Sequence, residues 1–217
     1  MTAKNGEMLG IDVDELAVPA IYKLLVGAVV PRPIAWVTTL NPVGKVNLAP
    51  FSFFTVVSVD PPILLVNSER RVGLAKDTPL NAKREGELVI NIVTEELAWP
   101  MHQSSAAPPP NVSETELLGI ALAPSVKVRT PRVTAAPIAI ECRLERLLEV
   151  GRAPSDVIFA EALYFHVRAD LIADGKIDMR RLHPLARLAG LTYARLGEIM
   201  DLPAVGDAGA VHAIRSE

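Results

Sequence analysis

Hydroxyl, amide and basic side chains recur where predicted strands end, or where a helix begins, in the first third of this chain. The set consists of Thr38, Thr39, Asn47, Ser52, Asn67, Ser68, Lys76 and Thr78. If neighbouring strands bring these ends together, they form a concave rim lined with hydrogen-bond donors. Each residue alone has an ordinary structural interpretation, because Ser and Thr commonly end strands and cap helices. Only the clustering favours a ligand site.

A phosphate monoester suits one end of this rim. Lys76 supplies a positive charge, while Ser68 and Thr78 supply hydroxyl donors. The first amides of the helix predicted to start near Lys76 would also point toward an anion.

A flat heteroaromatic group with amide-like edges suits the rest of the rim. Asn47 and the backbone of residues 49–52 can both donate and accept hydrogen bonds, and Trp36 and Phe51 offer apolar walls. The residue types therefore favour one ligand with a charged end and a planar end.

Several common catalytic signatures are absent from the sequence. It contains no G-x-S-x-G, no G-x-x-x-x-G-K-[ST], no G-x-G-x-x-G and no H-E-x-x-H. The four histidines are scattered without ligand spacing, which argues against a metal site. Cys142 is the only cysteine, so an internal disulfide is excluded, and its mid-strand position favours a buried structural thiol over a redox role.

The composition argues against a nucleic-acid-binding protein and against a membrane protein. The chain has 217 residues, a formal net charge of -3 and a mean hydropathy of +0.29. The slight excess of acidic residues does not favour binding to nucleic acid, which requires a positively charged surface. The longest apolar runs (24–30, 53–59 and 63–66) are far shorter than the roughly 18 residues of a membrane span. Residues 1–20 carry acidic side chains and no apolar h-region, so we expect a cytoplasmic protein that is not membrane-bound.

Hydrophobic patterning and turn residues predict six or seven mostly antiparallel strands with a few helices. We expect strands at 34–39, 53–59, 63–67, 88–93, 137–150 and 156–170, the last two forming a hairpin. We expect helices within 14–27, from Lys76 to Gly86 with Thr78 as N-cap, within 95–111, from Ser113 to Gly119, and over 179–189. The tail beyond Pro203 should be loosely ordered. Helices do not alternate with strands, so the pattern favours a mainly β fold, a β-barrel with peripheral helices, over a doubly wound sheet.

Longer motifs extend this interpretation. Collinear segments run from about Tyr22 to Tyr193: Tyr22-Lys23-Leu24-Leu25, the stretch 30–39, the stretch 47–54, Asp60-Pro61-Pro62, Lys76-Asp77-Thr78-Pro79, Val89-Ile90-Asn91, Glu141-Cys142 and Arg187-Leu188-Ala189-Gly190. Together they resemble the flavin reductase-like family, the FMN-binding split barrels that include the flavoredoxin-like proteins. The family's paired glycine is Ala189-Gly190 here.

The resemblance implies a Greek-key antiparallel split β-barrel, one domain over 1–217 with its core at about 20–195. Segments 1–20 and 203–217 would be peripheral. It also implies a homodimer with one FMN per subunit near the interface. The FMN contacts implied are Thr38 and Thr39 along the flavin or ribityl chain, Asn47, Ala49 and Ser52 at the ring edge and ribityl group, Asn67, Ser68, Lys76 and Thr78 at the phosphate, and Arg187 and Tyr193 near the ring, from the same or from the other subunit. The resemblance also implies Arg187 as the candidate catalytic residue, because it would lie next to the flavin.

The activity implied is hydride transfer from NADH or NADPH to the flavin, followed by electron transfer to free flavin, oxygen or a partner oxygenase. Three alternatives stay open: an electron carrier, a flavoenzyme acting on an organic substrate without nicotinamide, and a non-catalytic flavin-binding module. Arg70 and Arg71 are either solvated surface residues or a grip on a nicotinamide nucleotide phosphate. The proline-rich loop at 106–110 would shape access to the flavin.

Overall fold

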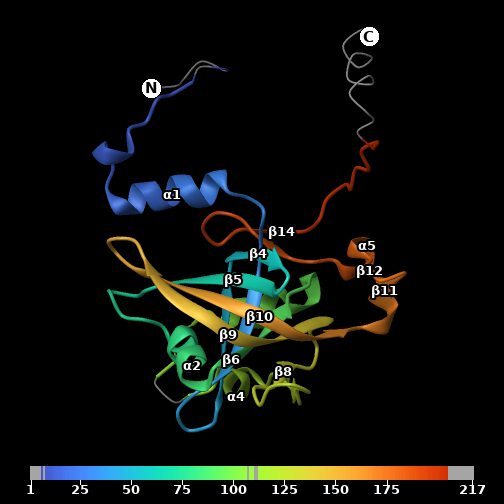
Figure 1. The fold of residues 1–217 in the computed structure, drawn as a ribbon. Coiled ribbons are helices and arrows are strands. Elements are labelled where there is room, and N and C mark those ends of the chain that lie inside the picture. Colours follow the sequence, from blue (N-terminus) through green and yellow to red (C-terminus); the bar gives the residue numbers. More distant parts are fainter. Residues whose placement is uncertain (1–5, 7, 107, 110–111, 205–217) are drawn as a thin grey trace.

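One antiparallel sheet organises the chain. The computed structural model describes residues 6, 8–106, 108–109 and 112–204 (Figure 1). The sheet has seven strands in the order β3-β2-β6-β9-β10-β5-β4. Their bounds are β2 (Ala35–Leu40), β3 (Val46–Phe51), β4 (Phe53–Val59), β5 (Pro62–Glu69), β6 (Glu87–Ile92), β9 (Ile138–Val150) and β10 (Ser155–Val167). The mainly antiparallel β fold with peripheral helices is confirmed, and the β9–β10 hairpin lies between β5 and β6 in Greek-key order.

The sheet is split rather than closed into a barrel. β3 and β4 are its two edge strands, and within the described residues no ladder joins them. Ser52 alone separates them along the chain. Because one residue links opposite edges, the sheet must coil until the edges meet at Ser52, and its twist favours such coiling. The connection therefore places the split at a fixed point of the sequence.

Short strands and helices surround this sheet. The small sheets pair β1 (Arg32–Pro33) with β13 (Ala186–Arg187) and β14 (Tyr193–Ala194), β7 (Leu122–Ala123) with β8 (Arg132–Val133), and β11 (Ile172–Ala173) with β12 (Lys176–Ile177). The helices are η1 (Val13–Glu15), α1 (Val18–Ala28), α2 (Asp77–Glu85), η2 (Glu95–Leu97), α3 (Ala98–Gln103), α4 (Glu114–Leu118), η3 (Ala169–Leu171) and α5 (Met179–Leu182). In Figure 1, α1 lies on one side of the sheet and α2 with α4 lie on the other. Among the described residues, no helix is long and apolar enough to cross a membrane.

Two hydrophobic clusters cover the two faces of the sheet. The larger includes Val37, Ile90 and Ile158. The smaller includes Trp36 and Leu48, which point to the opposite face from their strand neighbours. Both faces of β2 and β6 are therefore buried, as their nearly continuous apolar runs indicate.

Two predicted helix boundaries are wrong. Lys76, not Thr78, is the N-cap of α2, because the Thr78 hydroxyl accepts a hydrogen bond from Asn47 instead. The helix predicted over 179–189 ends at Leu182: His183 adopts a left-handed conformation before Pro184, and the chain then pairs as β13. Residues 205–217 of the predicted loose tail lie outside the described residues.

Candidate functional site

Three adjoining cavities meet where the sheet splits. Cavities A, B and C measure about 170, 300 and 100 Å³, and Pro50 and Phe51 line all three. Ser52 lines A and C, and Lys76 lines B and C. Shared walls make them one cleft, called here the split cleft, at the junction of β3 and β4.

The basic end of the cleft lies beside the start of α2. Lys76 is the N-cap residue of this helix, and its Nζ lies 5.6 Å from the centroid of the Phe51 ring. Burial lowers the pKa of Lys76, because few water molecules solvate its ammonium group. Arg71 also lines cavity B. An anion in this cavity would therefore meet two cations and the first amides of a nine-residue helix.

Amide and hydroxyl groups form the wall of cavity B. The Asn47 Nδ2 donates to Thr78 Oγ1 at 3.0 Å and to Thr39 Oγ1 at 3.3 Å. Asn81 Nδ2 donates to the same Thr39 hydroxyl at 3.1 Å. Asn47, Ala49 and Thr78 line the cavity. Thr39 is fully buried behind them and holds Asn47 in place.

The remaining predicted residues take different places. Asn67 lines cavity C. Thr38 is fully buried and donates to the Pro131 carbonyl at 2.7 Å. Neither Thr38, Thr39 nor Ser68 lines any of the three cavities. Within the described part of the chain, the buried Asn67 Oδ1 and Ser68 Oγ have no hydrogen-bond partner.

Cavity A is closed by a linked group of polar side chains. Arg187 donates hydrogen bonds to the Tyr193 hydroxyl and to the Gly190 carbonyl, and its guanidinium carbon lies 4.5 Å from the Tyr193 ring centroid. The Tyr193 hydroxyl lies 3.0 Å from His102 Nδ1. Since Arg187 can only donate, the hydroxyl accepts from it, while the direction of the hydrogen bond with His102 follows the tautomer of that ring. Arg187 and Tyr193 therefore reach the cleft of their own chain.

Sequence reasoning missed several cleft residues. His102 and Ser105 come from α3 and its C-terminal end, which no motif singled out. Glu114 lines cavity B and is only 6% exposed; its Oε2 accepts the Leu48 amide at 2.9 Å, and burial raises its pKa. Arg71, for which the sequence indicates no partner, lines cavity B. Its neighbour Arg70 does not line the split cleft, and Asp156 and Glu149 bind its guanidinium.

The groups in the split cleft fit a flavin mononucleotide. The half-buried ammonium of Lys76 and the buried Asn67 Oδ1, which has no partner among the described residues, would both be satisfied by a polar ligand. Phe51 gives the cleft a flat apolar wall, and the Arg187 group supplies donors at the far end. Charge at one end and a planar apolar wall at the other match a phosphate and a heteroaromatic ring.

An open antiparallel sheet with this cleft at its split defines a flavin-binding class of oxidoreductase. The family model of the flavin reductase like domain matches residues 26–186, and this chain belongs to that family. Membership confirms the expected resemblance and a flavin as the cofactor.

Similar proteins cover most of the chain. An uncharacterized protein of Halalkalibacterium halodurans is 38% identical over 194 residues, covering 87% of this chain and 93% of its own length. The crystal structure of nitrilotriacetate monooxygenase component B from Bacillus cereus is 38% identical with a TM-score of 0.88, over 91% of this chain and 100% of that one. The 2-nitrobenzoate 2-nitroreductase NbaA of Pseudomonas fluorescens is 32% identical with a TM-score of 0.81, over 93% and 100%.

Proposed function

We propose that this protein holds FMN in the split cleft and reduces it with NADH or NADPH. The observation that carries the proposal is the cleft's polarity, with the half-buried Lys76 ammonium at one end and the Arg187–Tyr193–His102 group at the other. When bound, the flavin supplies the redox chemistry by accepting a hydride from the nicotinamide.

The basic end would hold the phosphate. Lys76 and Arg71 provide two positive charges, and the amides of the first turn of α2 provide further donors. Asn47, fixed by Thr39 and Thr78, would present its amide to the ribityl chain or ring edge. A charge-assisted contact in a partly desolvated cavity is stronger than one in water, so this end would dominate affinity.

The Arg187 end of the cleft would make the bound flavin easier to reduce. Its guanidinium favours the negative charge that develops on the ring system as electrons arrive. The Tyr193 hydroxyl and Gly190 carbonyl fix the orientation of this guanidinium, so little reorganisation accompanies the reaction. Hydride transfer needs no separate acid or base, which agrees with the absence of a catalytic dyad motif in the sequence.

The second half of the proposal is a homodimer. Both the family resemblance and the apolar surface of α1 and of the two residues after it support the dimer. Leu24, Leu25, Val29 and Val30 are each more than two-fifths exposed. Exposed apolar surface of this kind typically marks a protein interface. Tyr22 and Val26 of the same helix line cavity A, so the dimer contact would adjoin the flavin.

The names of two similar proteins indicate two classes of electron acceptor for the reduced flavin. The relative NbaA is named as a 2-nitrobenzoate 2-nitroreductase, and component B is named as part of a monooxygenase. Reduction of an organic nitro compound, or supply of reduced flavin to an oxygenase partner, are therefore the two acceptor classes to compare.

Anaerobic spectroscopy tests the proposal. The purified protein is mixed with FMN, freed of unbound flavin, and titrated with NADH or NADPH while the flavin absorbance near ~450 nm is followed. Rapid bleaching supports the reductase function. Bound flavin that stays oxidised with either nucleotide refutes the nicotinamide step, and failure to retain flavin refutes the FMN site.

A further inference from the structure

A fourth cavity, D, lies away from the split cleft. It measures about 420 Å³ and is formed by Arg132 of β8, by residues 134–137 after that strand, and by residues 164–168, which end β10 and follow it. It shares no lining residue with cavities A, B or C. In Figure 1, β8 lies at the lower side of the sheet, whereas β4 and β14 lie at the upper side. A ligand in cavity D would therefore not contact the flavin.

Cavity D contains one cation without a counter-charge. The Arg132 Nε is buried and has no hydrogen-bond partner among the described residues, and no ion pair found in that part of the chain includes Arg132. Arg168, the other arginine of the cavity, is held by both carboxylate oxygens of Asp170 at 2.6 and 3.1 Å. Of the two arginines of cavity D, Arg132 is thus the one that no carboxylate among the described residues pairs with.

The buried carboxylate of Glu141 has hydrogen-bond partners other than Arg132. Glu141 is fully buried and accepts the Val126 and Lys127 amides at 2.7 and 2.5 Å. Its Oε1 also lies 2.6 Å from His166 Nε2. These contacts satisfy the oxygens of Glu141 and fix the His166 ring at the cavity wall.

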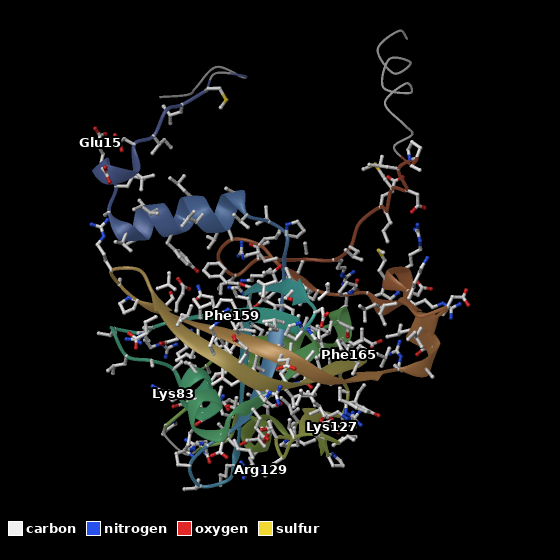
Figure 2. The ribbon with its side chains drawn as sticks, viewed as in Figure 1. Glu15, Lys83, Lys127, Arg129, Phe159 and Phe165 are labelled. Atoms are coloured by element: carbon white, nitrogen blue, oxygen red, sulfur yellow. The ribbon has the colours of Figure 1, made fainter. Side chains whose placement is uncertain are left out.

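The same wall is aromatic. Tyr164 and His166 alternate on β10 and so project from the same face, with ring centroids 4.9 Å apart. Tyr164 is 38% exposed. Pro137 adds apolar surface to the lining, whereas Phe165, labelled in Figure 2, also borders the cavity but alternates to the other face of β10. A planar apolar body could therefore lie against this wall while its charged group meets Arg132.

We propose that cavity D is a binding site for a small aromatic carboxylate. The planar guanidinium of Arg132 matches a carboxylate in a bidentate arrangement. The Tyr164–His166 wall matches an aromatic ring, because offset or edge contacts between rings are favourable. A compact inorganic anion uses only the first of these two features.

Calorimetric titration of the flavin-loaded protein with benzoate tests the site. Wild type should bind one benzoate per chain. The variant Arg132→Met keeps the aliphatic stem but removes the charge, and should weaken binding at least ~10-fold, as expected for a charge-assisted pair. The matched variant Arg195→Met removes an exposed arginine that does not line cavity D, and should change affinity less than threefold. The visible flavin spectrum should not change, because the cavities share no wall.

Ala135→Trp provides a second test that retains Arg132. This exposed residue lines cavity D, and the larger side chain should block benzoate while leaving the flavin content unchanged. The proposal is overturned if benzoate does not bind wild type, if it binds Arg132→Met equally well, or if its binding perturbs the flavin spectrum. Tighter binding of inorganic phosphate than of benzoate would likewise overturn the aromatic-acid assignment.

Discussion

At the scale of single residues, desolvated charge distinguishes the cleft from the rest of the surface. Lys76 is half-buried with its Nζ over the Phe51 ring, whereas Lys83, on the helix that follows and labelled in Figure 2, is exposed. Burying an ammonium group is unfavourable unless a counter-charge meets it. Lys76 therefore gains most when a phosphate binds.

Replacing Lys76 should weaken FMN binding selectively. We expect Lys76→Met to raise the FMN dissociation constant ~10- to 100-fold, since a hydrogen bond to a charged group contributes about 1.5–3 kcal/mol. Fluorescence titration of the apoprotein measures this. The control Lys83→Met should bind as wild type does, and equal losses in both variants would contradict a phosphate role for Lys76.

Arg187 should set the reduction potential of the bound flavin. Arg187→Met removes a positive charge next to the proposed ring site, so the reduced flavin is less stabilised. We expect the midpoint potential to fall by about 30 mV or more, which is about 1.4 kcal/mol for a two-electron couple. Spectroelectrochemistry provides the measurement. Arg195→Met, whose side chain is 75% exposed, is the matched control and should leave the potential unchanged.

At the scale of elements, one arginine joins α1 to the β13–β14 hairpin. Arg32 is 6% exposed, and its Nη1 donates to the Val26 and Val29 carbonyls at 2.8 and 2.5 Å. Its Nη2 donates to the Leu188 carbonyl at 2.7 Å. A cation at a helix C-terminus satisfies the free carbonyls and interacts favourably with the helix dipole. Both joined elements line cavity A, so Arg32 positions that cavity's walls.

Arg32→Met should weaken the contact between α1 and the β13–β14 hairpin and so lower the stability of the protein. Three carbonyls lose a charged donor, and we expect the free energy of unfolding to fall by about 2–4 kcal/mol. Chemical denaturation measures the change, and amide exchange should increase in α1 and around Leu188. The exposed Arg195→Met again serves as control. Unchanged stability and exchange in Arg32→Met would argue against the link.

Glu141 should make stability depend on acid pH. Burial opposes its ionisation, but hydrogen bonds from His166 and from the amides of Val126, Lys127 and Val128 outweigh this, so the pKa of Glu141 lies below its ordinary value of 4.5. A depressed folded-state pKa gives stabilisation that is complete above 4.5 and is lost as the pH falls through the folded value.

Denaturation of wild type and Glu141→Gln between pH 3 and 7 checks this sign. The difference in unfolding free energy should be largest near neutral pH and shrink below about pH 4.5. A difference that stays constant over this range would show that Glu141 acts through packing alone.

At the scale of the whole molecule, the apolar surface of α1 lacks a partner within the described chain. Leu25 and Val29 are 57% and 60% exposed. We expect wild type to sediment as a dimer and Leu25→Glu/Val29→Glu to sediment as a monomer, because buried charges without partners oppose association. Lys23→Gln, an exposed change on the same helix, should remain dimeric. A monomeric wild type would contradict the proposed dimer.

Local patterns in the sequence determined the long hairpin and all strands of the main sheet except β3, which was not predicted, and they determined two of the helix ends. Gly86 and Gly119 end their helices in the left-handed conformation, as predicted, because glycine adopts it without a Cβ clash. The cluster of donors at strand ends was also visible, and Asn47 and Lys76 do line one cleft.

Only the tertiary structure decided which polar side chains remain available to a ligand. Thr38 and Thr39 carry suitable hydroxyls, yet Pro131, Asn47 and Asn81 occupy them. Arg70 and Arg71 are neighbours in sequence, but partners on β9 and β10 bind only the first. Strand register and contacts between distant segments set these pairings, and neither is encoded in the spacing of nearby residues.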